Sequence, residues 1–314
     1  TTGVRNTLLG TFAGSNITSG TANVAVGYNS LGTEDAHGFN TAVGYQTLKV
    51  LNAGADAYNV AVGYQSGLSV TTGVNNTLIG GLAGDALTDA DFNVALGKSS
   101  LSSDTLGSRS TAVGTNALFS QNFTTATDSN NTAVGFEAGA NVTTGVFNTL
   151  MGGLAGDALT DADYNIAIGG NVLGTDTLGS RSTAIGHGAL FAQNFTTATD
   201  TYNTAVGYNA GSAVTTGQFN TLIGGLSGDA LTTGAQNVAI GYAALTSDDL
   251  GSHSVAVGPS ALFSQNFATA TNSYNTAVGS AAGGAVTTGT LNTLVGGLAG
   301  DALTVGGSNV SLGY

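Results

Sequence analysis

The sequence predicts an all-β protein, a parallel β-solenoid (β-roll) of about 18 stacked rungs. Three observations predict it. A five-residue motif recurs along the chain, its residues alternate as strand residues do, and a glycine closes each copy. The 314 residues include 50 glycines, and this abundance disfavours helices but suits short strands between tight turns. We expect residues 1–314 to form one continuous repeat array, a segment of a longer fibre protein.

The motif usually reads Asn or Ser, then Thr or Val, then a small residue or Leu, then an apolar residue, then Gly. Most copies start seventeen residues apart, with a spacing of twenty-one at three places and nineteen at one. Seventeen residues accommodate two short strands and two turns, which make one coil of a solenoid. The copies start at Asn6, Asn23, Asn40, Asn59, Asn76, Asn93, Ser110, Asn131, Asn148, Asn165, Ser182, Asn203, Asn220, Asn237, Ser254, Asn275, Asn292 and Asn309.

A longer period lies over the short one, because the copies at Asn59, Asn131, Asn203 and Asn275 are equally spaced, at seventy-two residues. The chain is therefore a super-repeat of four rungs. Residues 76–92 and 148–164 differ at only two positions, so the physics of one unit describes the others.

The strand alternation predicts which side chains share a face, because neighbouring residues of a strand point to opposite sides. Val24 and Val26 alternate with Asn23 and Ala25. Position four is apolar in every copy, so we expect positions two and four to point inward. The Asn at position one should form a ladder of side-chain amides.

Position three then points outward, and it is Ala in most rungs but Leu in one rung of every four. An exposed column of small residues with periodic Leu is typical of an interface. The alternative is that a neighbouring turn covers each Leu. The expected assembly face consists of Leu8, Ala25, Leu78, Ala95, Leu150, Ala167, Leu222, Ala239 and Leu294.

The motif resembles the head repeats of trimeric autotransporter adhesins of the YadA-like class, whose hallmark is Ser-Val-Ala-Ile-Gly. Residues 237–241 and 254–258 carry this resemblance, and the Asn-Thr-Ala-Val-Gly-Tyr form at 40–45 resembles repeats of long phage and marine surface-fibre proteins. The resemblance implies a left-handed β-roll, a homotrimer with the middle Ala facing its partners, and a role in cell adhesion. The rungs here are longer than typical head repeats, and every fourth rung is enlarged.

Charge and composition exclude several function classes. The net charge is −13, with only five Lys and Arg residues, so contacts to nucleic-acid phosphate are disfavoured. No apolar stretch is long enough for a membrane helix, so we expect no direct membrane insertion in this segment. The three histidines, His37, His187 and His253, lie in different rung contexts and predict no triad. We therefore expect no enzymatic activity.

Two sets of aspartates repeat with the rungs. The first could supply oxygen ligands to calcium, the only cofactor that the sequence suggests, although later copies lose two of the three carboxylates. Its members are Asp85, Asp89, Asp91, Asp157, Asp161 and Asp163. The second set comprises Asp104, Asp176 and Asp248, each five residues before an Arg or His, which suggests exposed ion pairs between turns.

The enlarged rung is the most plausible recognition surface, since loops on rigid scaffolds often carry binding residues. Its four extra residues bring two Phe and a Gln-Asn pair, although the Phe rings could instead fold back as a satellite core. The candidate ligand-binding residues are Phe119, Gln121, Asn122, Phe123, Phe191, Gln193, Asn194, Phe195, Phe263, Gln265, Asn266 and Phe267.

These observations favour an extracellular structural or adhesive fibre segment, on a cell surface or a virion, that self-associates as a homotrimer or filament and contacts a host receptor or glycan. The first alternative is a receptor- or glycan-binding phage tail fibre or tailspike. An ice-binding solenoid is disfavoured, because position two, where Thr is frequent, is expected to point inward.

Overall fold

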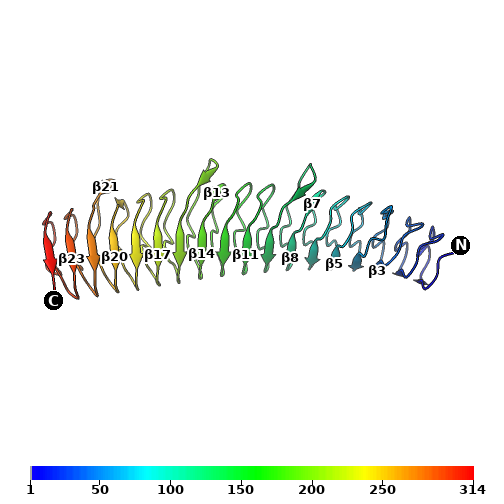
Figure 1. The fold of residues 1–314 in the computed structure, drawn as a ribbon, viewed down its shortest axis with the longest axis horizontal. Helices are drawn as coiled ribbons and strands as arrows, with labels where there is room; N and C mark the ends of the chain where they lie inside the picture. Colours follow the sequence, from blue (N-terminus) through cyan, green and yellow to red (C-terminus); the bar gives the residue numbers. More distant parts are fainter. Residues whose placement is uncertain (1) are drawn as a thin grey trace. The chain divides into compact units, whose positions relative to one another are not determined.

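The computed structural model describes residues 2–314 as an all-β protein, a parallel β-solenoid of about 18 turns spaced about 17 residues apart (Figure 1). The described residues contain no helix, so no helical segment suited to crossing a bilayer is found among them. The chain divides into two compact units, Thr1–Asp161 and Ala162–Tyr314. Each unit contains the same kind of rung, and each is described by itself.

Every rung contributes one three-residue strand, formed by positions two to four of the motif. In the first unit these strands are β1 (Thr7–Leu9), β2 (Val24–Val26), β3 (Thr41–Val43), β4 (Val60–Val62), β5 (Thr77–Ile79), β6 (Val94–Leu96), β8 (Thr111–Val113), β10 (Thr132–Val134) and β11 (Thr149–Met151). In the second unit they are β12 (Ile166–Ile168), β14 (Thr183–Ile185), β16 (Thr204–Val206), β17 (Thr221–Ile223), β18 (Val238–Ile240), β20 (Val255–Val257), β22 (Thr276–Val278), β23 (Thr293–Val295) and β24 (Val310–Leu312).

Strands of successive rungs pair in parallel and in register within each unit. Ala205 of β16, for example, lies beside Ala184 of β14 and Leu222 of β17. The enlarged rungs add three short parallel pairs, and their loops extend further than the neighbouring turns (Figure 1). These pairs are β7 (Gly107–Ser108) with β9 (Thr127–Asp128), β13 (Gly179–Ser180) with β15 (Thr199–Asp200), and β19 (Gly251–Ser252) with β21 (Thr271–Asn272).

The strand side chains point in the opposite directions from those that we predicted. In β16, Ala205 is buried while Thr204 and Val206 are only half-buried, so position three points inward. The predicted assembly face was therefore wrong, because its residues form the core. Leu8 is 44% exposed because its strand, β1, pairs on one side only, with β2. The other members have no exposed surface: Ala25, Leu78, Ala95, Leu150, Ala167, Leu222, Ala239 and Leu294.

Packing inside the coil explains why Leu appears at position three in one rung of four. A Cβ atom on Gly211 would lie 2.6 Å from Leu222 Cδ1, and one on Gly228 would lie 2.8 Å from Leu222 Cδ2. In the other two rungs of the same super-repeat, position three is Ala (Ala184 and Ala239) and the corresponding inner site holds a buried Leu, Leu190 or Leu245. The core keeps its volume by exchanging large and small residues between neighbouring rungs.

The Asn at position one forms a ladder, mostly through the backbone; direct amide-to-amide bonds also join Asn148 to Asn131 and Asn309 to Asn292. Asn203 Oδ1 accepts a hydrogen bond of 2.9 Å from the backbone N–H of Asn220 in the next rung. Asn203 Nδ2 donates to the carbonyl of Gly217, which lies at the end of its own coil, at 2.8 Å. Each buried amide therefore closes one coil and holds the start of the next, which satisfies both of its polar atoms.

The second half of each coil is not the short strand that we expected. In residues 45–48, Gln46 and Leu48 have φ angles of 55° and 45°, in the left-handed region. Their N–H groups point to opposite neighbours, with Gln46 donating to Tyr28 and Leu48 to Ser66. The alternation of backbone conformation keeps bonds between rungs without forming a sheet.

Candidate functional site

A buried polar network lies beneath each enlarged rung. In the first unit, Asp104 Oδ2 accepts a hydrogen bond of 2.6 Å from Gln121 Nε2, which also donates to Ser110 Oγ at 2.8 Å. Asp104 Oδ1 accepts from the backbone N–H groups of Gly107, at 3.0 Å, and Phe123, at 3.2 Å. The side chains of Asp104, Gln121 and Ser110 have no exposed surface. The carboxylate therefore fixes the base of the loop from inside.

The same network occurs twice in the second unit. Gln193 Nε2 bonds Asp176 Oδ2 at 2.5 Å, and Gln265 Nε2 bonds Asp248 Oδ2 at 2.5 Å. Burial raises the pKa of the Asp248 carboxyl group, since desolvation disfavours its charged form more than the hydrogen bonds from Gln265 and the backbone favour it. The prediction that Asp104, Asp176 and Asp248 form exposed pairs was wrong.

The exposed ion pairs use other aspartates. Arg109 Nε lies 3.0 Å from Asp128 Oδ2, and Arg181 Nε lies 3.0 Å from Asp200 Oδ2. The Arg109 guanidinium also lies over the ring of Phe92, 5.0 Å from its centroid. These side chains line one edge of the coil, where the residue before each Asn or Ser adopts the left-handed conformation.

Half of the predicted ligand-binding residues lie in the interior. The glutamines belong to the buried networks, and one Phe of each loop is core, with 4–5% of its surface exposed. The buried residues are Gln121, Phe123, Gln193, Phe195, Gln265 and Phe267. The other ring and the asparagine of each loop reach the surface: Phe119, Asn122, Phe191, Asn194, Phe263 and Asn266.

The structure does not bring the predicted calcium ligands together. Asp85 and Asp89 accept hydrogen bonds from the Ser102 and Thr72 hydroxyls of neighbouring rungs. Asp91 accepts from the backbone N–H of Val74 at 2.7 Å, so the three carboxylates serve different contacts. The second copy, Asp157, Asp161 and Asp163, is likewise not gathered into a group of possible metal ligands within residues 2–314.

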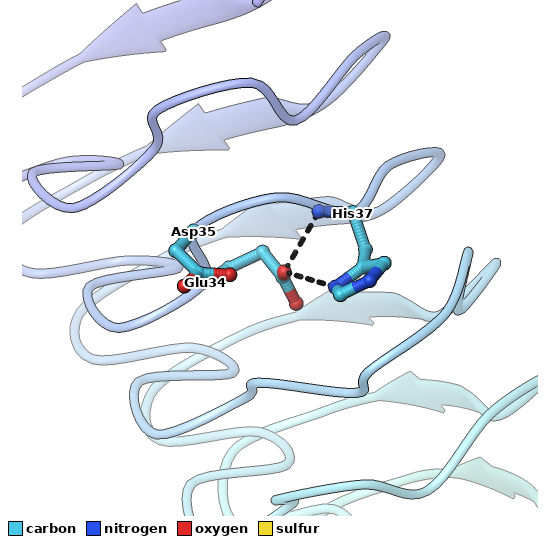
Figure 2. A group of neighbouring side chains, drawn as sticks. All are labelled: Glu34, Asp35 and His37. Carbon is cyan, nitrogen blue, oxygen red and sulfur yellow. Dashed lines mark hydrogen bonds and ion pairs between the residues drawn. The ribbon is translucent and has the colours of Figure 1, made fainter. Parts of the chain in front are cut away.

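One such group does occur in the part of the chain that the structure describes, and it consists of Glu34, Asp35 and His37 (Figure 2). One ligand atom of each residue lies within 4.8 Å of the others. Glu34 is fully buried, and its Oε1 accepts the His37 backbone N–H at 3.1 Å and lies 3.3 Å from Nδ1 of the same residue. Two carboxylates and an imidazole are donors of the kind that bind divalent cations. Sequence reasoning missed this group because it occurs in only one rung.

The outward face of the strands is a regular surface that runs along each unit. Its positions two and four carry only Thr, aliphatic side chains and one Met, with no charge at any strand. Several of these side chains are exposed, among them Leu96 at 44%, Met151 at 41% and Ile223 at 37%. Sequence reasoning missed this face because it assigned these side chains to the core.

Tyrosines after the motif glycine stack on one another in neighbouring rungs. Tyr45 lies between Tyr28 and Tyr64, with ring centroids 5.3 Å and 5.5 Å away. These rings cover the turns of neighbouring rungs. In the second unit, His187 occupies the same position and stacks on Tyr208 at 5.8 Å.

No model of a known protein family matches the chain, and no curated protein matches it.

Proposed function

We propose that the chain is a structural and adhesive segment of an extracellular fibre, on a cell surface or a virion, and that it self-associates as a homotrimer rather than catalysing a reaction. The observation that carries the proposal is the uncharged outward face of the strands in each unit. This face replaces the position-three column as the assembly face. The resemblance to trimeric autotransporter heads, read from the motif, supports the number of chains but not the contact, because the middle Ala that it would place between chains is in the core here.

The length and lack of charge of the face support a second copy of the chain as its occupant. Nine strands at about 4.8 Å spacing give each unit an uncharged face roughly 40 Å long. An exposed apolar surface of this extent is typical of an interaction site. Identical Thr and aliphatic rows on every copy suit a symmetric contact between identical chains.

The test is the oligomeric state in solution, measured by sedimentation velocity across micromolar concentrations. Wild type is expected to be a trimer. Val206→Glu places a charge on the half-buried outward face and should shift the population towards monomer without loss of the β-type circular dichroism spectrum. Thr216→Glu, at an exposed turn of the same rung, is the matched control and should leave the trimer intact.

A monomeric wild type would reject the proposal. Ala205→Glu provides a further check on which face is which, because Ala205 is in the core. This variant should lose its folded spectrum altogether, whereas a variant on the outward face should only dissociate.

An ice-binding solenoid is a second candidate, favoured by the outward orientation of position two. Thr and aliphatic side chains form two parallel rows at strand spacing, as in Thr204 and Val206 of β16. A monomeric chain that shows thermal hysteresis, lost in Val206→Glu, would favour this function. A trimer without thermal hysteresis would exclude it.

A further inference from the structure

An open cleft lies on the second unit, on the turns of three successive rungs and away from the outward strand face. Its volume is about 540 Å³, within the range of small-molecule sites. The lining includes Asn171, His187, Gly188, Phe191, Asn209 and Ser212.

Two glycines open this cleft. A Cβ atom on Gly188 would lie 2.3 Å from Asn209 Oδ1, and one on Gly174 would lie 2.9 Å from Phe191 Cε2. The other two enlarged super-repeats carry side chains at both positions. They are Asn116 and Ser260 in place of Gly188, and Ser102 and Thr246 in place of Gly174. The cleft therefore follows from residues that distinguish this copy from its sisters.

Gly188 also interrupts a ladder of polar side chains that runs between neighbouring rungs. At equivalent positions elsewhere, Gln65 Nε2 donates to Gln46 Oε1 at 2.9 Å, and Asn116 Nδ2 donates to Glu137 Oε1 at 3.3 Å. Asn171 and Asn209 flank the missing side chain, and neither carboxamide makes a hydrogen bond within residues 2–314. Each retains its full donor and acceptor capacity for a ligand.

The remaining lining fits an uncharged ligand with one apolar face. The Phe191 ring is 44% exposed, and none of the lining residues is Lys, Arg, Asp or Glu. The ring offers an apolar surface, while the two carboxamides offer donors and acceptors on either side of the gap. An anionic ligand would find no Lys or Arg here, on a chain whose net charge is −13.

We propose that this cleft binds a neutral hexopyranoside unit of a glycan. The apolar face of the sugar packs on the Phe191 ring, and its hydroxyl groups exchange hydrogen bonds with the carboxamides of Asn171 and Asn209. The inference deepens the adhesive part of the proposed function and rests on it. It does not involve the outward strand face that is proposed to hold copies together.

The experiment titrates the full chain with methyl glycosides of glucose, galactose, mannose and N-acetylglucosamine, each up to about 50 mM, and follows binding by saturation-transfer NMR. At least one is expected to bind saturably with a dissociation constant in the millimolar range. Phe191→Ala and Gly188→Asn, which fills the gap with the residue of a sister copy, should each weaken binding at least about tenfold.

The matched control is Phe263→Ala, because Phe263 is an equally exposed ring (43%) at the equivalent place of another copy. Its binding should equal that of wild type. The inference fails if none of the four glycosides binds, or if Phe191→Ala and Phe263→Ala behave alike. Sedimentation of the same samples reports self-association separately, so either proposal can fail alone.

Discussion

The first super-repeat and the three later ones each bury a carboxylate beneath the longest rung, but the residues around it differ. In each later super-repeat a buried Asp is linked by hydrogen bonds to a Gln, and the Gln to a Ser. The enlarged rung, for example 182–202, is the longest rung of its super-repeat. In the first copy Glu34 takes the place of the Asp, Leu51 that of the Gln and Asn40 that of the Ser. The corresponding rung, 40–58, is two residues shorter. The Gln therefore occurs only together with the smaller Ser and the longer loop.

The buried hydrogen-bond network and the longer loop therefore depend on each other. Glu34 accepts the backbone N–H of His37, three residues further on, without a Gln in the next rung, where Leu51 stands. The shorter Asp176 bonds the backbone N–H groups of Gly179 and Phe195 and leaves its second oxygen to Gln193. A buried carboxylate with no cation nearby requires each of these donors.

Gln193→Leu, which makes a later copy resemble the first at this position, should have the largest effect. It leaves the buried Asp176 Oδ2 without a donor, and we expect a loss of about 3–5 kcal/mol in the free energy of unfolding. Urea denaturation followed by circular dichroism measures it. The double variant Asp176→Asn/Gln193→Leu should lose less than Gln193→Leu alone, since the amide oxygen still accepts the N–H groups of Gly179 and Phe195 and no buried charge is left unpaired. A double variant worse than the single one would contradict the account.

Glu34→Ala should have a smaller effect than the loss of Gln193. Its carboxylate accepts the His37 N–H at 3.1 Å and lies 3.5 Å from the Ala53 nitrogen. Removing it leaves one or two backbone N–H groups unpaired, for which we expect a loss of about 1–3 kcal/mol in the same urea experiment. A loss equal to that of Gln193→Leu would mean that the two copies do not differ as described.

Asp248 should make the stability of the chain depend on pH. Its pKa is raised by burial above the unfolded value of 3.8, so the folded state retains a proton that the unfolded state releases. The stability gained from this proton is complete below pH 3.8 and is lost as the pH rises through the raised pKa. The free energy of unfolding of wild type minus that of Asp248→Asn, measured by urea titration at several pH values, should therefore fall with increasing pH across this window. A flat or rising difference would refute the assignment.

Arg109→Ala should have the smallest effect, because the Arg109–Asp128 pair is half-exposed on both sides. In the first copy, Phe39 stands at this position and stacks on Tyr58 at 4.9 Å, so a charge is not required there. We expect a loss of less than about 1 kcal/mol in unfolding free energy, shrinking further near 1 M salt. A loss that salt does not reduce would point to packing on Phe92 instead.

The repeat period, the parallel stacking and the structural role of the position-one Asn could all be predicted from the sequence. The facing of the strands could not, because both faces of a strand such as Thr204–Val206 are apolar or neutral, and alternation alone does not say which is inside. The pairing of Leu222 with Gly211 and Gly228 holds the missing signal, since a large residue matched by distant glycines indicates a crowded interior.

The candidate sites were harder to predict, because they depend on contacts between rungs. Asp85, Asp89 and Asp91 are close in the chain, yet they bond to rungs on opposite sides. The cleft beside Phe191 depends on glycines at positions 174 and 188, where other copies have side chains. Such a replacement produces no recognisable sequence motif. Only comparison of that copy with its sisters would have singled it out.

The matching of large and small core residues between rungs limits how the number of rungs in the array can change. Leu222 needs its glycines in the same and the preceding rung, and Asp176 needs its glutamine in the rung that follows. Deleting a single rung would place mismatched partners side by side, whereas adding or removing a whole super-repeat restores every pairing at the new junction. Natural length variants of this array should therefore differ by whole multiples of the four-rung period.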